Sequence, residues 1–288
     1  MNEDIRLSVI TPVLNGAKHI GGCIQNVIDQ RCSGLEHIIV DGGSTDGTVD
    51  IIKQYAQKYG HIRLESDPNG GQSHAMNKAL KLARGRIIGV LNADDYYEAD
   101  VLNRMIKLFF ALPEPGLLVG NCYVRGDNEK VVGWNRPKNL RQEDLLFGWS
   151  SVNPFPVNPS AYLYSRALHQ KIGFYNEDDH YSLDIEFLLR AVTVAHIRYV
   201  DEFWGNFRFI EGTKTYEDKK SGGNHQRIEL LLESYIKRLT LLKRMKVRAT
   251  RFIFKQLKVH YFYCRICYYA VDPKRIGGFF ARRLKNSR

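Results

Sequence analysis

The chain has 288 residues, of which 44% are hydrophobic and 25% are charged, as is ordinary for a soluble globular protein. It contains no apolar run of about 18 residues, so we expect no transmembrane helix, and the acidic residues 1–4 do not resemble a signal peptide. Five cysteines without framework spacing fit a reducing compartment, and we therefore expect a cytoplasmic protein.

Positive charge is concentrated toward the carboxyl end. The net charge of the chain is +11, yet residues 1–220 contain 25 Lys or Arg against 28 Asp or Glu. Residues 221–288 contain 17 Lys or Arg and only three acidic residues, a net charge of +14. A near-neutral body with a strongly basic tail indicates an anionic partner surface.

In the first hundred residues, short apolar runs rich in Ile and Val alternate with stretches of helical spacing. The runs are typical of buried strands, and the stretches between them are typical of amphipathic helices. Strands are predicted at residues 7–12, 37–41, 62–65 and 87–91, and helices at about 20–28, 49–55 and 73–84. This alternation predicts an α/β fold with a doubly wound, mostly parallel sheet flanked by helices.

The second half of the chain is less regular. Residues 153–159 are punctuated by prolines and have no periodicity, whereas residues 181–191 have helical spacing. After the polar residues 212–224, apolar residues recur at helical spacing, namely Ile228, Leu232, Tyr235, Leu239 and Leu242. We therefore predict a domain of residues 1–215 followed by a basic, aromatic-rich helical extension of residues 216–288.

The predicted strand at residues 87–91 leads directly to two adjacent carboxylates, Asp94 and Asp95. In an open α/β sheet, ligands bind beyond the carboxyl ends of the strands. Hard cations such as Mg²⁺ and Mn²⁺ take oxygen ligands, often one or two carboxylates together with substrate phosphate. The pair therefore predicts a site for a metal and a phosphorylated ligand. The alternative is that the two residues cap the next helix.

Asp41 and Asp67 also lie at or just after the carboxyl end of a predicted strand. Carboxylates gathered at one sheet edge repel one another unless a cation or hydrogen-bond donors satisfy them. Asp41 suits a hydrogen bond from a base N–H or from ribose hydroxyls, and its alternative role is to start the Gly42-Gly43 turn. The chain has neither a P-loop nor a complete G-x-G-x-x-G motif, which argues against P-loop kinases and dinucleotide dehydrogenases.

Five segments, in order and in register, carry a resemblance to a known enzyme family. They read SVITPVLN at residues 8–15, IVDGGSTDGT at 39–48, NGGQSHAMNK at 69–78, LNADD at 91–95 and SLDIEFLLR at 182–190. With these segments the chain resembles an inverting family 2 glycosyltransferase with the GT-A fold of nucleotide-diphospho-sugar transferases. The resemblance extends over about 70% of the chain, from residue 7 to about residue 208.

The resemblance implies a nucleotide pocket, a metal ligand and a general base. The implied nucleotide-binding residues are Thr11, Pro12, Asn15, Asp41, Asp67, Gly71 and Asp94. Asp95 is the implied ligand of Mg²⁺ or Mn²⁺, and Asp184 is the implied general base on the acceptor side. From the helical pattern alone, Asp184 would be a solvated position. If the register is shifted, the base is instead one of three nearby carboxylates, Glu177, Asp178 and Asp179.

Three positions depart from the family pattern. His74 stands where relatives often carry an acid, and either contact with a diphosphate or a capping and packing role fits a histidine there. Asn92 stands where some relatives carry a third acid, which leaves the metal site to Asp95. Asn158 stands where relatives often carry Gln or His, so the resemblance does not define the acceptor contacts.

The implied reaction moves a hexose from a nucleotide-diphospho-sugar, with UDP as the expected nucleotide, to a hydroxyl of a glycan or lipid-linked acceptor in polysaccharide biosynthesis. A divalent cation would neutralise the leaving diphosphate, and one carboxylate would accept the hydroxyl proton. Two other functions remain open from the sequence. One is a non-catalytic sugar-nucleotide-binding protein that recruits partners, and the other is a sugar nucleotidyltransferase.

The basic tail at residues 221–288 has two interpretations. It could present Lys and Arg to anionic lipid headgroups, which would make the protein peripheral at the inner face of the cell membrane. It could equally pair with a second copy of the chain to form a homo-oligomer. The aromatic residues interleaved at 261–280 favour the membrane interface. No recognised motif supports nucleic-acid binding.

Overall fold

The computed structural model describes residues 4–68, 70–147, 155–156, 158–178, 182–221 and 223–256. It contains strands β1 (Leu7–Val13), β2 (Leu35–Asp41), β3 (Ile62–Ser66), β4 (Ile87–Val90), β5 (Tyr96–Tyr97), β6 (Gly116–Arg125), β7 (Val131–Asn135), β8 (Tyr162–Ser165) and β9 (His196–Arg208). Its helices are α1 (Ile20–Asp29), α2 (Thr48–Lys58), α3 (Gly71–Leu82), α4 (Val101–Phe109), α5 (Gln142–Leu145), α6 (Leu168–Ile172), α7 (Leu183–Ala191), α8 (Lys214–Ser221), α9 (Gly223–Arg238) and α10 (Leu241–Gln256), with 3₁₀ turns η1 (Asp127–Glu129) and η3 (Pro159–Ala161).

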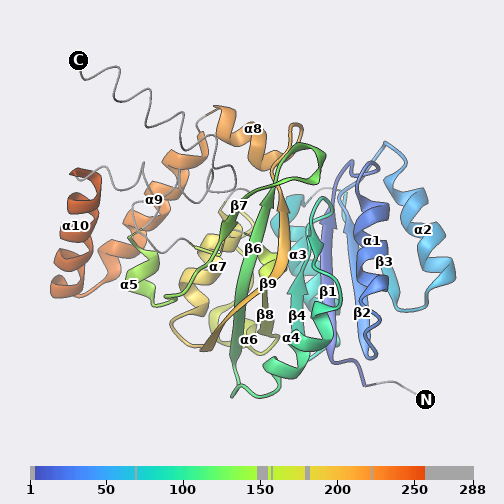
Figure 1. Cartoon of the computed structure of the whole chain (residues 1–288), viewed down its shortest axis with the longest axis horizontal. Helices are drawn as coiled ribbons and strands as arrows, with labels where there is room; N and C mark the ends of the chain where they lie inside the picture. Colours follow the sequence, from blue (N-terminus) through green and yellow to red (C-terminus); the bar gives the residue numbers. More distant parts are fainter. Residues whose placement is uncertain are drawn as a thin grey trace.

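The strands form one sheet in the order β3-β2-β1-β4-β8-β6-β9-β5 (Figure 1). In addition, β7 pairs with the carboxyl-terminal part of β6, from Cys122 to Arg125. β1 runs parallel to both β2 and β4, and β2 runs parallel to β3. The predicted α/β class with a doubly wound sheet is therefore confirmed. Antiparallel pairing enters with β8, which lies between β4 and β6. This mixed region corresponds to the half of the sequence where the regular alternation ends.

The order of the strands creates a switch point between β1 and β4. From β1 the chain continues outward through β2 and β3, and it then returns to the other side of β1 as β4. Ligands of open α/β sheets bind at such a point, beyond the carboxyl ends of the strands. The register aligns these ends, because Val13 lies opposite Asp41 and Asp41 lies opposite Ser66.

Both faces of the sheet are covered by apolar packing. On β1, alternate side chains point to opposite faces, so that Val9 and Ile10 belong to different core clusters. One cluster joins the sheet to α4, chiefly through Leu102, Met105, Ile106 and Phe109. The other joins the sheet to α3, α7 and α9. The loops at the carboxyl edge are therefore held from both sides of a rigid layer.

The carboxyl-terminal helices differ in part from the prediction. Ile228, Leu232 and Tyr235 on α9 are buried in the main core cluster, as their spacing predicts. The pattern does not continue into a single helix, because the chain breaks after α9 and restarts as α10, and Leu242 is 81% exposed. The polar residues 212–224 contain the short helix α8. The boundary after residue 215 stays a prediction, and residues 261–280 lie outside the described residues.

None of the helices in the described part of the chain is long and apolar enough to cross a membrane.

A buried carboxylate joins β1, β2 and the segment before β4. Glu36 on β2 is fully buried and accepts hydrogen bonds from Ser8 Oγ at 2.6 Å and from the backbone N and Nε of Arg84 at 2.7 and 2.9 Å. Arg63 Nη1 adds an ion pair at 3.2 Å. Burial alone would raise the pKa of Glu36, but these donors outweigh it and hold the pKa below its ordinary value of 4.5.

We expect Glu36→Gln to lower the free energy of unfolding by about 2–3 kcal/mol at neutral pH, because it removes the charge that these buried donors satisfy. Since the folded-state pKa is depressed, the contribution of Glu36 is complete above pH 4.5 and is lost as the pH falls through the folded-state pKa. Urea unfolding at neutral pH and at about pH 4 measures both effects. Glu65→Gln is the matched control, because Glu65 is partly exposed and its Oε1 lies 3.9 Å from Arg63 Nη2. An equal loss for both variants would contradict the prediction.

Candidate active site

Asp41 ends β2 and presents a buried acceptor to the carboxyl edge of the sheet. Its Oδ2 accepts hydrogen bonds from the backbone N of Gly43 at 2.9 Å and of Ser44 at 3.0 Å, so it does start the predicted turn. The φ angle of Gly43 is 93°, a left-handed conformation that favours glycine. Oδ1 of Asp41, in contrast to Oδ2, is buried and has no hydrogen-bond partner among the described residues. An unpaired buried acceptor is costly, which makes this oxygen a ready partner for a ligand N–H.

The loops after β1 and β2 are joined by Asn15. Its backbone N donates to Ser44 Oγ at 2.8 Å, and its Oδ1 accepts from the backbone N of Thr45 at 2.9 Å. Asn15 has a φ of 50°, which Asn tolerates better than most residues. This junction holds the two loops together beside Asp41.

Thr11 and Pro12, the predicted nucleotide-binding residues on β1, differ in exposure. Thr11 is fully buried, and its Oγ1 lies 2.9 Å from His37 Nε2. Burial lowers the pKa of His37 to about 3, so this ring is neutral. Thr11 can therefore shape the crevice through its backbone, whereas the half-buried Pro12 can contact a ligand through its ring.

Asp67 and Gly71 lie on the next loop, between β3 and α3. The backbone N of Asp67 donates to the carbonyl of Asp41 at 2.7 Å, which places the two residues side by side. The carboxylate of Asp67 pairs with His74 Nδ1 on the first turn of α3. Gly71 begins this helix with a φ of 69°. His74 is therefore engaged with a carboxylate of the predicted pocket, a contact that its sequence position did not indicate.

Asp95 is buried and is satisfied by the protein itself. Its Oδ2 accepts hydrogen bonds from Asn92 Nδ2 at 2.9 Å and from Asn158 Nδ2 at 2.6 Å, and its Oδ1 accepts from the backbone N of Arg208 at 3.0 Å. Burial raises the pKa of Asp95, and the neighbouring Asp94 raises it further. The alternative role as a helix cap is wrong, because β5 follows Asp95 and Asp100 is the N-cap of α4.

Asp94 is only partly buried, and two basic side chains lie near it. Burial raises the pKa of Asp94, and the charges of His19 and Arg208 partly offset this shift. His19 Nδ1 and Arg208 Nη1 are 3.2 Å apart, and Arg208 Nη2 forms an ion pair with Glu129 at 2.7 Å. Arg208 Nε is buried and has no hydrogen-bond partner among the described residues. The edge therefore combines a carboxylate with donors suited to an anionic ligand.

Sequence reasoning missed both His19 and Arg208. His19 precedes α1 and lies outside every motif, and Arg208 ends β9, more than a hundred residues after Asp94. β9 follows β6 in parallel and reaches the carboxyl edge only through pairings that the sequence pattern does not reveal. The one available signal is that Arg208 ends a strand, as the predicted site residues do.

Asp184 lies in the first turn of α7 and is only partly exposed, whereas its helical pattern indicates a fully solvated position. Burial raises the pKa of Asp184 to about 6, while the charge of Lys214 and the hydroxyl of Tyr162 partly offset the shift. Tyr162 begins β8 and precedes Leu163, which lies opposite Gly89 of β4, so it lies beside the carboxyl end of β4 that leads to Asp94. Lys214 Nζ donates to Gln72 Oε1 at 3.2 Å, linking α8 to α3 at this edge.

The alternative general bases have different surroundings. Glu177 accepts a hydrogen bond from Asn77 Nδ2 at 3.0 Å and is thus engaged with α3. Asp178 is exposed, and Asp179 lies outside the described residues.

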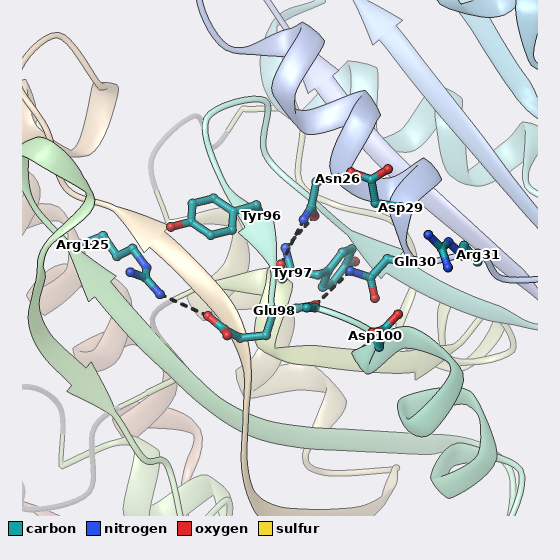
Figure 2. Close-up of a pocket in the computed structure, with 10 residues that line it drawn as sticks. Asn26, Asp29, Gln30, Arg31, Tyr96, Tyr97, Glu98, Asp100 and Arg125 are labelled. Carbon is teal, nitrogen blue, oxygen red and sulfur yellow. Dashed lines mark hydrogen bonds and ion pairs between the residues drawn. The ribbon is translucent and has the colours of Figure 1, made fainter.

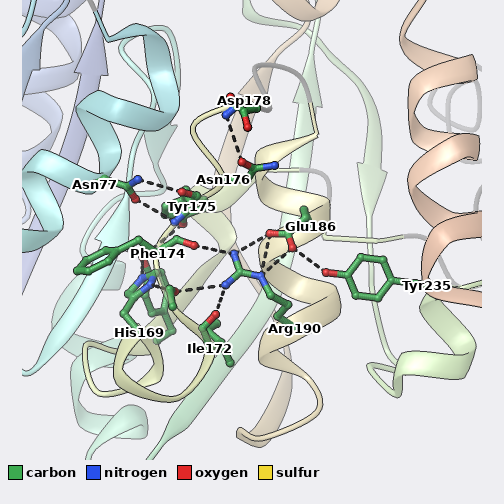
Figure 3. Close-up of polar contacts among 12 residues, drawn as sticks. Asn77, His169, Ile172, Phe174, Tyr175, Asn176, Asp178, Glu186, Arg190 and Tyr235 are labelled. Carbon is green, nitrogen blue, oxygen red and sulfur yellow. Dashed lines mark hydrogen bonds and ion pairs between the residues drawn. The ribbon is translucent and has the colours of Figure 1, made fainter. Parts of the chain in front are cut away.

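Arg190 fixes the position of α7 (Figure 3). Its guanidinium holds the carboxylate of Glu186 on the preceding turn at 2.6 Å, and it donates to the carbonyls of Ile172 and, at 3.1 Å, Phe174. The hydroxyl of Tyr235 on α9 donates to Glu186 Oε1 at 2.6 Å. α7, whose first turn carries Asp184, is thus tied to the preceding segment and to α9.

A separate cleft of about 470 Å³ lies between the end of α1 and the segment after β5 (Figure 2). Its polar groups largely satisfy one another. Asn26 Nδ2 donates to the carbonyl of Tyr97 at 3.0 Å, and Arg125 pairs with Glu98 at 3.2 Å. It contains none of the predicted site residues.

The model of the family described as Glycosyl transferase family 2 matches residues 8–173. A PGL/p-HBAD biosynthesis glycosyltransferase of Mycobacterium bovis is 34% identical over 187 residues, which cover 64% of this chain and 68% of that protein. The uncharacterized glycosyltransferase YibD of Escherichia coli is 40% identical over 95 residues. That match covers 33% of this chain and only 28% of the relative's length.

Two solved structures share the fold at low sequence identity. S. aureus TarS 1-349 in complex with UDP-GlcNAc has a TM-score of 0.59 and 22% identity, over 73% of this chain and 60% of that chain. Mannosyltransferase PcManGT from Pyrobaculum calidifontis, in complex with GDP-Man and Mn²⁺, has a TM-score of 0.56 and 20% identity, over 85% of this chain and 73% of that chain. These similarities confirm the predicted GT-A-type fold.

We expect Arg190→Lys to lower the free energy of unfolding by about 2 kcal/mol, because an ammonium group cannot replace a planar fork that serves a carboxylate and backbone carbonyls together. Chemical denaturation measures the change. Arg198→Lys, at an exposed position of β9, is the matched control and should change stability by no more than about 0.5 kcal/mol. Similar losses at the two positions would show that the contacts of Arg190 do not stabilise the fold.

Proposed function

Because the chain belongs to glycosyl transferase family 2, we propose that it transfers a hexose from a nucleotide-diphospho-sugar to a hydroxyl of a glycan or lipid-linked acceptor, with inversion at the anomeric carbon. One observation carries this proposal. Near the carboxyl edge of the sheet lie Asp41 Oδ1, which is unpaired among the described residues, the partly exposed Asp94, and Asp184, whose pKa is raised by burial. Each has the chemistry of one part of the reaction.

Asp41 is the proposed receptor of the nucleotide base. The backbone N–H groups of Gly43 and Ser44 donate to Oδ2 and hold the carboxylate in place. Oδ1 can therefore accept a hydrogen bond from a ring N–H without a change in the side-chain conformation. Uracil, thymine and guanine each present such an N–H. Of the two structural relatives, one is a complex with UDP-GlcNAc and the other with GDP-Man. We propose UDP as the nucleotide, and Pro12, Asn15, Asp67 and Gly71 as residues of the surrounding pocket wall.

The diphosphate belongs beside Asp94, His19 and Arg208. The buried Nε of Arg208 is a hydrogen-bond donor without an acceptor among the described residues. Phosphate oxygens are suitable acceptors for a guanidinium group. Burial lowers the pKa of His19, with a further contribution from Arg208, so the imidazole is mostly neutral at physiological pH. It then offers one N–H, while Arg208 supplies the positive charge.

The residues of this edge also fit a divalent cation. The described residues contain no group of three or more His, Cys, Asp or Glu that could hold a metal ion alone. Mg²⁺ and Mn²⁺ are instead commonly bound by one or two carboxylates together with substrate phosphates. When bound, such a cation would neutralise the charge that develops on the leaving diphosphate.

We propose Asp94 as the direct carboxylate contact of this cation. The resemblance alone favours Asp95, whose role as a ligand stays untested. Asp95 is buried, and both of its oxygens already accept hydrogen bonds from fixed donors, whereas Asp94 is partly exposed. In this arrangement Asp95 positions the backbone on which Asp94 is carried.

Asp184 is the proposed general base. Its pKa of about 6 leaves it ionised at neutral pH yet more basic than an ordinary aspartate, which suits proton transfer from a hydroxyl. The acceptor oxygen attacks the anomeric carbon, its proton passes to the Asp184 carboxylate, and the bond to the nucleoside diphosphate breaks. A single displacement of this kind needs one base, and it does not need the acid–nucleophile pair of retaining glycosidases.

Nucleotide binding tests the donor half of the site. In calorimetric titrations with UDP, GDP and dTDP, each with and without Mn²⁺, we expect UDP to bind and Mn²⁺ to strengthen its binding. Asp94→Ala should remove the Mn²⁺ dependence, because it removes the partly exposed carboxylate. Asp41→Asn should weaken binding at least about tenfold with or without Mn²⁺, because an amide cannot both accept the turn hydrogen bonds and present a second acceptor.

Asp100→Asn, at an exposed carboxylate of the same segment, is the matched control for both variants. If wild-type protein binds none of the three nucleotides, the donor proposal is wrong. If GDP or dTDP binds instead of UDP, only the choice of nucleotide is wrong.

Turnover tests the base. We expect Asp184→Asn to reduce kcat by about 10²–10⁴-fold while UDP binding is retained, because only proton acceptance is removed. In the wild type, kcat/KM should rise as the pH increases through about 6 and then level off, since the ionised form is the active one. Hydrolysis or transfer from UDP-hexose, followed by UDP release, provides the assay. Asp178→Asn, at an exposed carboxylate six residues earlier, should leave both quantities unchanged. Loss of turnover in that variant instead would move the base to Asp178.

A further inference from the structure

Helix α10 presents an apolar stripe to solvent. Five large apolar side chains on it are more than half exposed, namely Leu241 (68%), Leu242 (81%), Met245 (61%), Phe252 (62%) and Ile253 (53%). Their spacing places them on one side of the helix. On the other side, Val247 is fully buried in the main core cluster. The outward direction of the stripe is therefore fixed by how α10 packs.

All charged residues of this helix are basic. It carries Lys243, Arg244, Lys246, Arg248, Arg251 and Lys255 and no acidic residue. Several of these charges are matched within the protein, as Lys243 pairs with Glu143 at 2.6 Å and Arg248 with Glu233 at 3.3 Å. Lys246 borders the apolar stripe, is exposed, and forms no ion pair with the residues that the structure describes.

The positive charge extends beyond the helix. Residues 257–288 contain eight Lys or Arg and a single acidic residue, Asp272. In sequence, α10 and the residues that follow it thus combine apolar side chains with an excess of positive charge, and this combination selects the partner. A protein groove would satisfy the apolar stripe without any need for the cations, whereas anionic lipid satisfies both at once.

We propose that the apolar stripe of α10 docks on the surface of a membrane rich in anionic phospholipid. Amphipathic helices of this composition lie in the plane of the interface, with their apolar side chains at the boundary of headgroups and acyl chains and their cations among the headgroups. This mode needs no membrane-spanning helix, and none is found in the described part of the chain.

The position of α10 suits this contact. In Figure 1 it lies at one end of the long axis of the molecule, beyond α9 and far from α1 and α2. α9 is anchored by Ile228, Leu232 and Ile236, which are all buried in the core. Arg244 Nη2 on α10 donates to the carbonyl of Leu239 at 3.1 Å, which braces the turn between the two helices. The stripe can therefore meet a flat surface without rearrangement of the body.

Sedimentation with sucrose-loaded vesicles tests the proposal on the full chain. We expect binding to vesicles of phosphatidylcholine with about 30% phosphatidylglycerol to exceed binding to pure phosphatidylcholine at least about tenfold. Raising the salt concentration to about 0.5 M should weaken this binding, because the electrostatic part is screened. Inorganic phosphate at millimolar concentration should not compete, since a dissolved anion leaves the apolar stripe unsatisfied.

The double variant Leu242→Ser/Phe252→Ser should lose at least about tenfold in vesicle binding, and Lys246→Glu should lose part of it. Phe110→Ser is the matched control, because Phe110 is the 42% exposed C-cap residue of α4 and should not affect binding. Thermal unfolding and UDP titration of each variant check that the fold is intact. As an independent measurement, the fluorescence of Phe252→Trp should shift to shorter wavelength when anionic vesicles are added.

Three results would overturn the proposal. They are absence of wild-type binding to anionic vesicles, equal binding of the wild type and the double variant, and concentration-dependent self-association through the stripe without vesicle binding. The proposal does not depend on the catalytic assignment, so it survives or fails separately from the nucleotide titrations.

Discussion

The buried carboxylate of Asp95 is the interaction on which the arrangement of the site depends. It joins three parts of the chain that are distant in sequence, through Asn92 after β4, Asn158 before β8 and the backbone of Arg208 at the end of β9. Burying a carboxylate costs several kcal/mol unless donors surround it. Because these donors come from three separate segments, the carboxylate is satisfied only when the parallel half and the mixed half of the sheet meet correctly. The proposed site residues Asp94 and Arg208 are held in their relative positions by this junction.

The parallel half of the fold could be read from the sequence because its signals are local. Apolar runs of four to seven residues, each followed by a turn and an amphipathic stretch, indicate strand and helix without knowledge of distant partners. Once these strands are parallel, their carboxyl ends must share one edge, which is why Asp41, Asp67 and Asp94 could be grouped in advance. The proposal of Asp184 as the general base came from the family resemblance, since its helical pattern alone indicated a solvated position.

The rest of the site depends on long-range pairing and could not be read this way. Arg208 reaches Asp94 only because β9 lies beside β6 and β5, and a strand order of this kind leaves no periodic signal. The distinction between Asp94 and Asp95 is likewise a matter of burial, since adjacent identical residues are equivalent in sequence. The break between α9 and α10 was missed for a related reason. Apolar spacing continues across it, but after the break the apolar residues Leu241, Leu242 and Met245 face solvent.

Asp95 and Asp184 show how one residue type serves two purposes at this edge. Burial raises the pKa of both. The oxygens of Asp95 accept hydrogen bonds from two amide side chains and a backbone N–H, all fixed donors, so the carboxylate acts as a structural anchor. Among the described residues, the charge of Lys214 and the hydroxyl of Tyr162 partly offset the raised pKa of Asp184, and Lys214 also donates to Gln72. Because burial raises the pKa of Asp184 while the residue stays partly exposed, its carboxylate keeps the basicity and the accessible oxygen that proton acceptance requires. The difference in described partners and in exposure therefore separates Asp95, as an anchor, from Asp184, the proposed base.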